Sequence, residues 1–364
     1  MVTFAKSPAG KLFARLGVFA AIIVSGSVAV LLAGQAPAAS TNGGSAKADP
    51  WVAKRTSWGD PDLQGIWTTD DEFNVPVERS REFGTRAMLT EEEVAQRARD
   101  AERRARDDKA DRRALREDQT GDGPEHWYEQ GKVISRRTSL IVDPPDGRIP
   151  PFTPEGQKRA KAQREKSSLA NGPWNGPEDL DLRDRCITRG VPNTWFPSAY
   201  NNGFQIVQSP GYVAIFYERL HEARVIPMDG RPHVSSGVRQ WIGDSRGRWE
   251  GDTLVVEAKN FSEKSQFRGA SENLRLVERY TRVDADTVKV EFTVDDPTTW
   301  TRPWTAMVTG RKDPFYWQIF EYACHEGNYG MFNILSGARA QERAAEQAAR
   351  KAAQKATQKP TEKK

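Results

Sequence analysis

Apolar and polar residues alternate most regularly in the last third of the chain. Between residues 287 and 294, Val288, Val290, Phe292 and Val294 alternate with threonine, lysine and glutamate. This is the period of a β-strand with one dry and one wet face. Neighbouring apolar runs, separated by turn residues such as Asp-Ala-Asp and Asp-Asp-Pro, predict further strands. The predicted strands of this region are 253–259, 274–283, 287–294, 301–309 and 315–322.

Three more apolar runs lie in the middle of the chain, in a segment that contains two of the four histidines. They cover 204–208, 212–218 and 223–228. The turn signals Ser-Pro-Gly and Asp-Gly follow the first and the third run. Residues 219–222 form either a hairpin tip or the middle of one long strand. In a long strand, Tyr217, Arg219 and His221 would share a face.

No segment of βαβ length separates these strands, so a parallel sheet is disfavoured. Turns recur every 10–15 residues or so, which is typical of an up-and-down meander. Eight strands are enough to close a small barrel with room for one ligand. We therefore predict a mainly β fold, an antiparallel up-and-down barrel with inserted surface helices.

Residues 90–117 have helical propensity and begin with a Thr90/Glu93 capping box. Their apolar stripe is thin, so we expect a solvated surface helix, with a partner-binding helix as the alternative. Thr153-Pro154-Glu155 predicts the start of a second, short basic helix. The basic, Ala-rich tail 336–364 has little to bury, and we expect it to be frayed or disordered.

Residues 1–38 have the features of a secretory signal. Basic residues precede the apolar run 18–33, and Ala36-Pro37-Ala38 is a small-x-small cleavage pattern. A retained membrane anchor is the alternative. With cleavage, residues 39–60 would be a linker, residues 61–335 the β domain, and the mature protein periplasmic or secreted with no stable membrane span.

Cysteine occurs twice, at Cys186 and Cys324. In an oxidising compartment a single pair favours a disulfide, although two separate thiols or a metal pair are alternatives. A bridge would place residues 184–186 beside residues 324–326.

The whole chain carries a formal charge of +4. The signal contributes +3 and residues 339–364 contribute +5, so the remaining body is about −4. We therefore expect no nucleic-acid surface. The sequence has no glycine-rich phosphate loop, HExxH motif or Gly-x-Ser-x-Gly elbow. His221, His233 and His325 could join Glu222 or Glu326 in a metal site, but their spacing matches no compact ligand pattern. We predict neither a metal nor an organic cofactor.

Acid–base catalysis is a more specific hypothesis than a metal site, because histidine titrates near neutral pH. The predicted catalytic residues are His221, His325 and Glu326, which we expect to face one cavity together with Tyr217 and Arg224. The predicted substrate-binding residues are Tyr200, Tyr217, Arg224 and His233. The alternative is that these polar residues cap strand ends.

Gly65-Ile66-Trp67 is a Gly-x-Trp sequence, which recurs at Gly247-Arg248-Trp249. In this the chain resembles lipocalin-like (calycin) barrels, where Gly-x-Trp opens the first strand; a tryptophan filling any β core is the alternative. The segments PDLQGIW, WEGDTLVVE and YACHEGNYGM also resemble a bacterial family of exported proteins of unknown function. That resemblance implies an organisation but no activity.

Two functional classes follow. One is a cofactor-independent periplasmic enzyme, a lyase, isomerase, hydratase or hydrolase, acting on a small, partly apolar molecule. The other is a non-catalytic ligand-binding or envelope protein of the same fold. Histidines converging in the interior would favour the enzyme, and an apolar interior would favour binding.

Overall fold

The computed structural model describes residues 51–114, 129, 131–167, 174–265, 267–314 and 316–357. They belong to one compact unit, residues 50–364. The predicted signal 1–38 and most of the predicted linker lie outside the described residues. Within the described part of the chain, no helix combines the length and the apolar character needed to cross a membrane.

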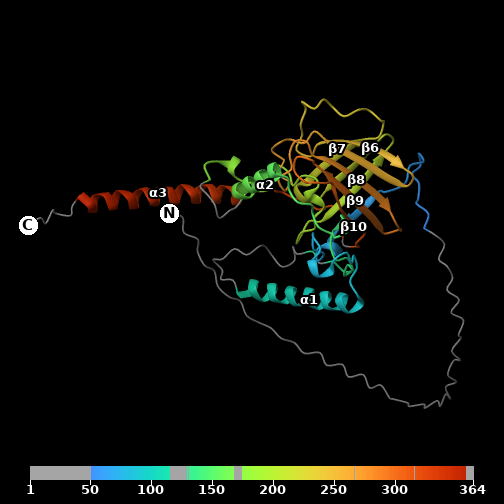
Figure 1. The fold of residues 1–364 in the computed structure, drawn as a ribbon, viewed down its shortest axis with the longest axis horizontal. Coiled ribbons are helices and arrows are strands. Elements are labelled where there is room, and N and C mark those ends of the chain that lie inside the picture. The colour runs from blue at the N-terminus through green and yellow to red at the C-terminus, as the bar shows by residue number, and fades with distance from the viewer. Residues whose placement is uncertain are drawn as a thin grey trace, which may run out of the picture. The chain divides into compact units, whose positions relative to one another are not determined.

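In the described part of the chain, ten strands form one antiparallel sheet (Figure 1). In chain order they are β1 (Gly65–Thr68), β2 (Ile141–Asp143), β3 (Gly203–Ser209), β4 (Tyr212–Tyr217), β5 (Glu222–Pro227), β6 (Asp244–Glu250), β7 (Thr253–Lys259), β8 (Arg275–Arg282), β9 (Thr287–Asp295) and β10 (Trp304–Arg311). Their order across the sheet is β5-β4-β3-β1-β10-β9-β8-β7-β6, and β2 pairs with β10 off this path. The prediction of a mainly β, antiparallel fold is confirmed.

The sheet ends in two edge strands, β5 and β6, which no described ladder joins. Neighbouring strands run antiparallel along this path, so β5 and β6 run parallel to each other. They nevertheless approach through side chains. A side chain at Gly247 would overlap Met228 Sδ and lie 2.8 Å from Ile226 Cγ2. The edges thus meet at a seam without backbone pairing, and a closed barrel is not formed by the described hydrogen bonds.

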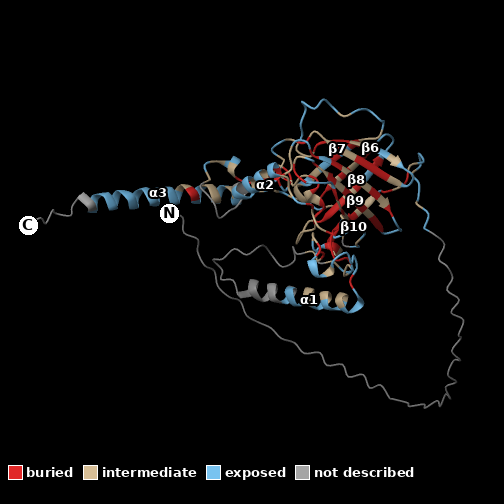
Figure 2. Ribbon diagram, viewed as in Figure 1, coloured by how far each residue is buried: buried red, intermediate tan, exposed pale blue. Residues whose placement is uncertain are grey.

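The inward face of the sheet forms the core (Figure 2). On β9, Val288, Val290, Phe292 and Val294 are fully buried, as their alternation predicted. Burying each such side chain contributes roughly 1.5–3 kcal/mol. Trp67, from the Gly-x-Trp sequence that forms β1, is also fully buried in this core.

Three helices lie outside the sheet (Figure 1): α1 (Glu91–Ala114), α2 (Pro154–Ser167) and α3 (Tyr329–Thr357). The predicted capping box begins α1, because Thr90 N donates to Glu93 Oε2 at 2.8 Å and Glu93 N donates to Thr90 Oγ1 at 3.3 Å. Thr153 Oγ1 caps α2 by accepting from Gly156 N at 3.0 Å. Both predicted helices are therefore present as far as the described residues extend.

The structure differs from the sequence predictions in three places. Residues 316–322 are irregular rather than a strand, and β6 was not predicted because DSRGRWE lacks apolar alternation. The tail expected to be frayed or disordered is helical, within α3, up to Thr357. Of the two alternatives predicted for residues 219–222, the structure shows the hairpin tip. Arg219–His221 is a short 3-10 turn (η6) with positive φ at Leu220 and His221, and Glu222 begins β5.

Candidate functional site

A cavity of about 320 Å³ lies where α2, residues 181–196 and the connection from β7 to β8 meet. Its volume is at the lower end of the range for small-molecule sites, about 300–1,000 Å³. Its apolar wall includes Val191, Phe196, Phe261, Phe267 and Leu274. All five belong to the hydrophobic core, so this wall of the cavity is formed by well-packed side chains.

Aromatic contacts fix the shape of the wall. The rings of Phe196 and Phe267 stack with centroids 6.2 Å apart, and Phe196 also meets Phe292 of β9 edge to face at 5.5 Å. The short 3-10 turn Asn193–Trp195 (η5) ends at Trp195, and Phe196 follows it directly. Phe196 lines the cavity, whereas Trp195 is buried against Glu278 in the sheet interior. The segment around Phe196 therefore separates the cavity from the interior.

The cavity is cationic. Four arginines and one aspartate line it, namely Arg164, Arg183, Arg189, Arg268 and Asp181. Arg183 is neutralised by Asp181, whose Oδ2 lies 2.6 Å from its Nη2. The Arg268 guanidinium lies 5.3 Å from the centre of the Phe196 ring, a cation–π contact at the cavity wall. Positive charge thus exceeds negative charge around an apolar pocket.

Among these arginines, Arg189 is the one best placed to bind an anion. Its Nη2 donates to Phe196 O at 2.7 Å and its Nη1 makes a long hydrogen bond of 3.4 Å to Ser198 Oγ. Among the described residues, no carboxylate pairs with it. Burial, together with the positive charges of Arg219 and Arg183, lowers the pKa of Arg189 to about 9. Arg189 is therefore still charged at neutral pH, but in surroundings that lack a compensating anion.

A half-buried acid, Glu222, holds the turn that carries Arg189. Thr188 Oγ1 donates to Glu222 Oε1 at the start of β5, and Gly190 N donates to Thr188 Oγ1 at 2.7 Å. Gly190 has φ +73°, a conformation that favours glycine. Burial raises the pKa of Glu222, while hydrogen bonds from Thr188 and the Gly190 backbone oppose that rise. The sheet edge thereby fixes the position of the Arg189 backbone.

The predicted disulfide is present between Cys186 and Cys324, with Cα atoms 5.6 Å apart. It joins the turn preceding Arg189 to a segment distant in sequence. Asn328 Nδ2 adds a hydrogen bond of 2.8 Å to Asp184 O. Residues 184–186 and 324–326 therefore lie side by side, as expected.

The predicted catalytic residues lie outside the cavity. His221 is exposed at the β4–β5 hairpin tip, with Nε2 2.7 Å from Phe320 O and 2.9 Å from Tyr322 N. One ring nitrogen satisfies only one of these contacts at a time, since it either donates or accepts. His325 and Glu326 are also exposed.

Tyr217 and Arg224 are instead buried, 2% and 3% exposed. Arg224 Nη1 lies 2.6 Å from Glu278 Oε2, and its Nη2 donates to Tyr280 Oη at 2.8 Å. The Arg224 guanidinium lies 6.0 Å from the centre of the Tyr217 ring. These two predicted residues share one interior network, and the exposed His221 is not part of it. The expectation that all of them face one cavity is therefore wrong, because the positive-φ turn carries His221 to the surface.

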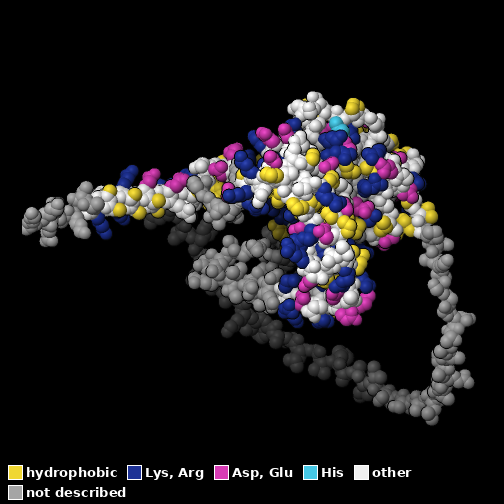
Figure 3. Space-filling model, viewed as in Figure 1, with side chains coloured by type: hydrophobic (Ala, Val, Ile, Leu, Met, Phe, Trp, Pro, Cys, Tyr) yellow, Lys and Arg dark blue, Asp and Glu magenta, His cyan; other side chains and the backbone are white. Residues whose placement is uncertain are grey.

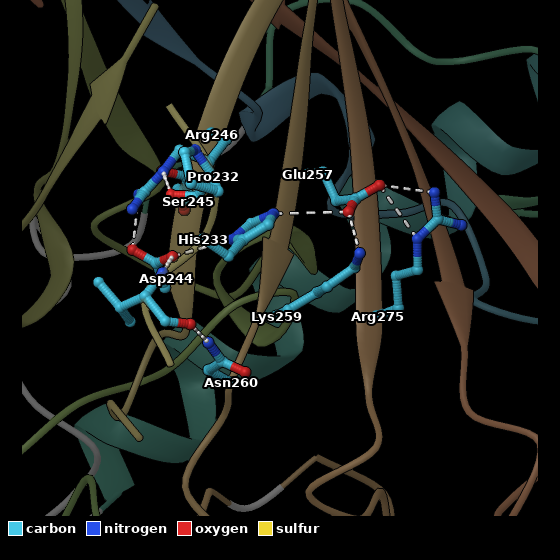
Figure 4. A network of polar contacts seen from close by, with 10 residues as sticks. Pro232, His233, Asp244, Ser245, Arg246, Glu257, Lys259, Asn260 and Arg275 are labelled. Carbon is cyan, nitrogen blue, oxygen red and sulfur yellow. Dashed lines mark hydrogen bonds and ion pairs between the residues drawn. The ribbon is translucent and has the colours of Figure 1, made fainter. Parts of the chain in front are cut away.

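His233 belongs to a third location, shown in Figure 4. Its Nδ1 lies 2.9 Å from Asp244 Oδ2 and its Nε2 3.4 Å from Glu257 Oε1. Burial alone would raise the pKa of Glu257, but hydrogen bonds from Lys259 and Arg275 lower it to about 2. Both ring nitrogens therefore face carboxylates, which ties the loop after β5 to β6 and β7.

Tyr200 contacts Arg219, which shares a hydrogen-bond partner with Arg189. The guanidinium of Arg219 stacks over its ring at 4.8 Å, and Arg219 shares Ser198 Oγ with Arg189. Neither Arg189 nor Arg268 belongs to a sequence motif, so neither was predicted as a site residue. The only sequence signal for Arg189 as a site residue was its position between Cys186 and the tryptophan-containing loop. The disulfide gives this position significance, because it fixes the turn that precedes Arg189.

Comparisons with family models, curated proteins and solved structures found no match to this chain. Within the described ranges, no group of His, Cys, Asp and Glu residues has an arrangement that could hold a metal ion.

Proposed function

We propose that the protein binds a small, partly apolar molecule in the cavity beside Arg189. The observation that carries the proposal is the cavity itself, about 320 Å³ in volume and walled by core aromatic residues. Preformed apolar pockets with a few polar groups are the usual sites of small-molecule binding. Ligand binding is favoured over catalysis because His221 and His325 do not reach this cavity.

The structure around β1 supports a lipocalin-like organisation as part of the proposal. Gly65-Ile66-Trp67 lies in the first strand, and Trp67 fills the core. The Cys186–Cys324 disulfide supports an oxidising compartment, hence export. On the face shown in Figure 3, basic and acidic side chains are interspersed. We propose a periplasmic or secreted ligand-binding protein.

A fluorescence titration with the neutral dye N-phenyl-1-naphthylamine tests the site. The dye should bind with saturation and emit more strongly in an apolar pocket. Ala270 lines the cavity, so Ala270→Phe should fill it and weaken binding by about tenfold or more. Ala95→Phe, on the exposed surface of α1, is the matched control and should bind like the wild type.

The proposal fails if the wild type does not bind the dye, or if a folded Ala270→Phe variant binds it equally well. Circular dichroism would establish that the variant is folded. The catalytic roles of His221, His325 and Glu326 stay predictions. Turnover of a bound molecule that His221→Ala abolishes would favour the enzyme instead.

A further inference from the structure

We infer that the cavity selects organic anions, and that its ligand is an apolar or aromatic acid whose anionic group is held by Arg189. The inference rests on the proposed ligand-binding function and adds the chemical class of the ligand.

The first reason is that Arg189, which is half-buried, differs from the buried arginines in its partners. Arg224 is paired with Glu278 at 2.6 Å and Arg137 with Glu72 at 2.8 Å. Arg79 lacks a carboxylate, but it is held by oxygens, including Thr138 Oγ1 at 2.8 Å and Pro145 O at 2.6 Å, and it does not line the cavity. Arg189 alone among these combines a place on the cavity wall with the lack of an acidic partner within the described residues.

The second reason is the number of donors that Arg189 keeps available. A guanidinium has five N–H donors in a planar fork. In the described structure Arg189 uses one in a good hydrogen bond to Phe196 O and one in a long contact with Ser198 Oγ. A carboxylate or sulfonate can accept two parallel hydrogen bonds from such a fork. An anion would also offset the repulsion between Arg189 and the neighbouring Arg183 and Arg219, which lowers its pKa.

The third reason is that the charge and the apolar wall adjoin. Arg189 is hydrogen-bonded to the backbone of Phe196, and the ring of the same residue lines the cavity between Phe267 and Arg268. A ligand whose anionic group reaches Arg189 would therefore place its apolar body directly on the aromatic wall. Compact aromatic acids have this arrangement of charge and surface.

Two dyes of the same skeleton test the inference. 8-Anilino-1-naphthalenesulfonate carries a sulfonate that N-phenyl-1-naphthylamine lacks. We expect the wild type to bind the sulfonate about tenfold or more tightly than the neutral dye. Arg189→Met should weaken binding of the sulfonate about 10–100-fold, the loss expected for charge-assisted hydrogen bonds. It should leave binding of the neutral dye nearly unchanged.

Two further variants separate position from overall charge. Lys158→Gln removes an exposed cation of α2 that does not line the cavity and should change the affinity for the sulfonate less than threefold. Arg189→Lys keeps the charge without the fork and should retain part of the preference for the anion.

The outcomes distinguish the inference of anion selectivity from the proposal that the cavity binds a ligand. If both dyes bind, Ala270→Phe blocks both and Arg189→Met does not change the ratio of their affinities, then the anion inference is overturned and the ligand-binding proposal stands. If Lys158→Gln acts as strongly as Arg189→Met, the overall charge of the protein rather than a specific contact sets the preference, and the inference is again overturned. If neither dye binds to the cavity, the proposed function itself fails.

Discussion

Arg224 and Glu278 meet inside the sheet, with Nη1 and Oε2 2.6 Å apart and side chains 2% and 0% exposed. They come from β5 and β8, which are not neighbours in the sheet. Trp195 Nε1 donates to Glu278 Oε1 at 2.7 Å, which supports the carboxylate from a third segment. Burial alone would lower the pKa of Arg224, but the adjacent Glu278 raises it well above its usual value. Arg224 is therefore charged in the interior, where it faces the carboxyl group of Glu278.

Glu278→Gln should destabilise the protein by about 3–5 kcal/mol, because it leaves a buried guanidinium uncompensated. The double variant Arg224→Met/Glu278→Gln should recover most of this loss, since it removes both charges. Urea unfolding followed by circular dichroism measures both. Glu250→Gln, in the exposed pair with Arg279, is the matched control and should change stability little. A single variant as stable as the wild type would show that the interior pair is solvated.

Three buried or partly buried acids meet at the end of β1. Asn202 Nδ2 donates to Asp70 Oδ1 at 2.8 Å and Asn202 N donates to Glu129 Oε2 at 3.2 Å, while Asn201 Nδ2 donates to Glu218 Oε1 at 2.8 Å. Burial and the charge of Glu129 raise the pKa of Asp70 to about 6. Burial also raises the pKa values of Glu129 and Glu218.

These raised pKa values predict a loss of stability as the pH rises. The folded state binds protons more tightly than the unfolded state, so the contribution of Asp70 is complete below about pH 4 and is lost as the pH rises through about 6. A shift from 3.8 to about 6 corresponds to about 3 kcal/mol.

Asp70→Asn, which resembles the protonated acid, should therefore be more stable than the wild type at pH 7.5 and similar to it at pH 4.5. Unfolding in urea at both pH values measures the difference. The control Glu326→Gln removes an exposed carboxylate and should not show this pH-dependent gain. An Asp70→Asn variant that is less stable than the wild type at pH 7.5 would contradict the expected sign.

The sequence predicted the elements whose side chains alternate. The period of β9 is visible because its inward residues, such as Val290 and Phe292, are all apolar. On β8 the inward positions include Glu278 and Arg282 beside Leu276 and Tyr280, so the same periodicity brings polar residues inside. The regular spacing of β8 could have identified Glu278 as a buried acid. Its partner Arg224 on β5, however, lies 54 residues away in the sequence.

The site was less predictable because it depends on turns and on contacts between distant segments. The single cysteine pair was enough to predict the disulfide. His221 and Arg224, only one hairpin tip apart, were expected to converge, but the turn at Leu220 and His221 directs one outward and leaves the other inside. The Arg189 cavity requires α2, residues 181–196 and the β7–β8 connection together, and no local pattern encodes that assembly.

The β5–β6 seam gives a third prediction. Gly247→Ala should destabilise the protein by about 1–3 kcal/mol, because its methyl group would press on Met228 and Ile226 at the point where the edge strands meet. Gly237→Ala is the control, since the only atom near its side-chain position is Ser235 Oγ at 3.9 Å. Thermal unfolding compares the two variants. Equal stability would show that the two edges do not pack at Gly247.

The disulfide gives the last prediction, which concerns local order around Arg189. Cys186 and Cys324 are 138 residues apart, and in the entropy model closing so long a loop contributes about 4–5 kcal/mol. The same bond fixes residues 320–328, which also contact the body through His221 and Asn328. Reduction should therefore increase amide hydrogen exchange in 184–190 and 320–328 more than in β9, and it should weaken binding of 8-anilino-1-naphthalenesulfonate.

His221→Ala without reduction separates the two attachments: it should loosen 320–322 while leaving 184–190 and dye binding close to the wild type. If reduction leaves exchange in 184–190 unchanged, Glu222 and Thr188 are sufficient to hold the Arg189 turn. The disulfide would then act only by lowering the conformational entropy of the unfolded chain.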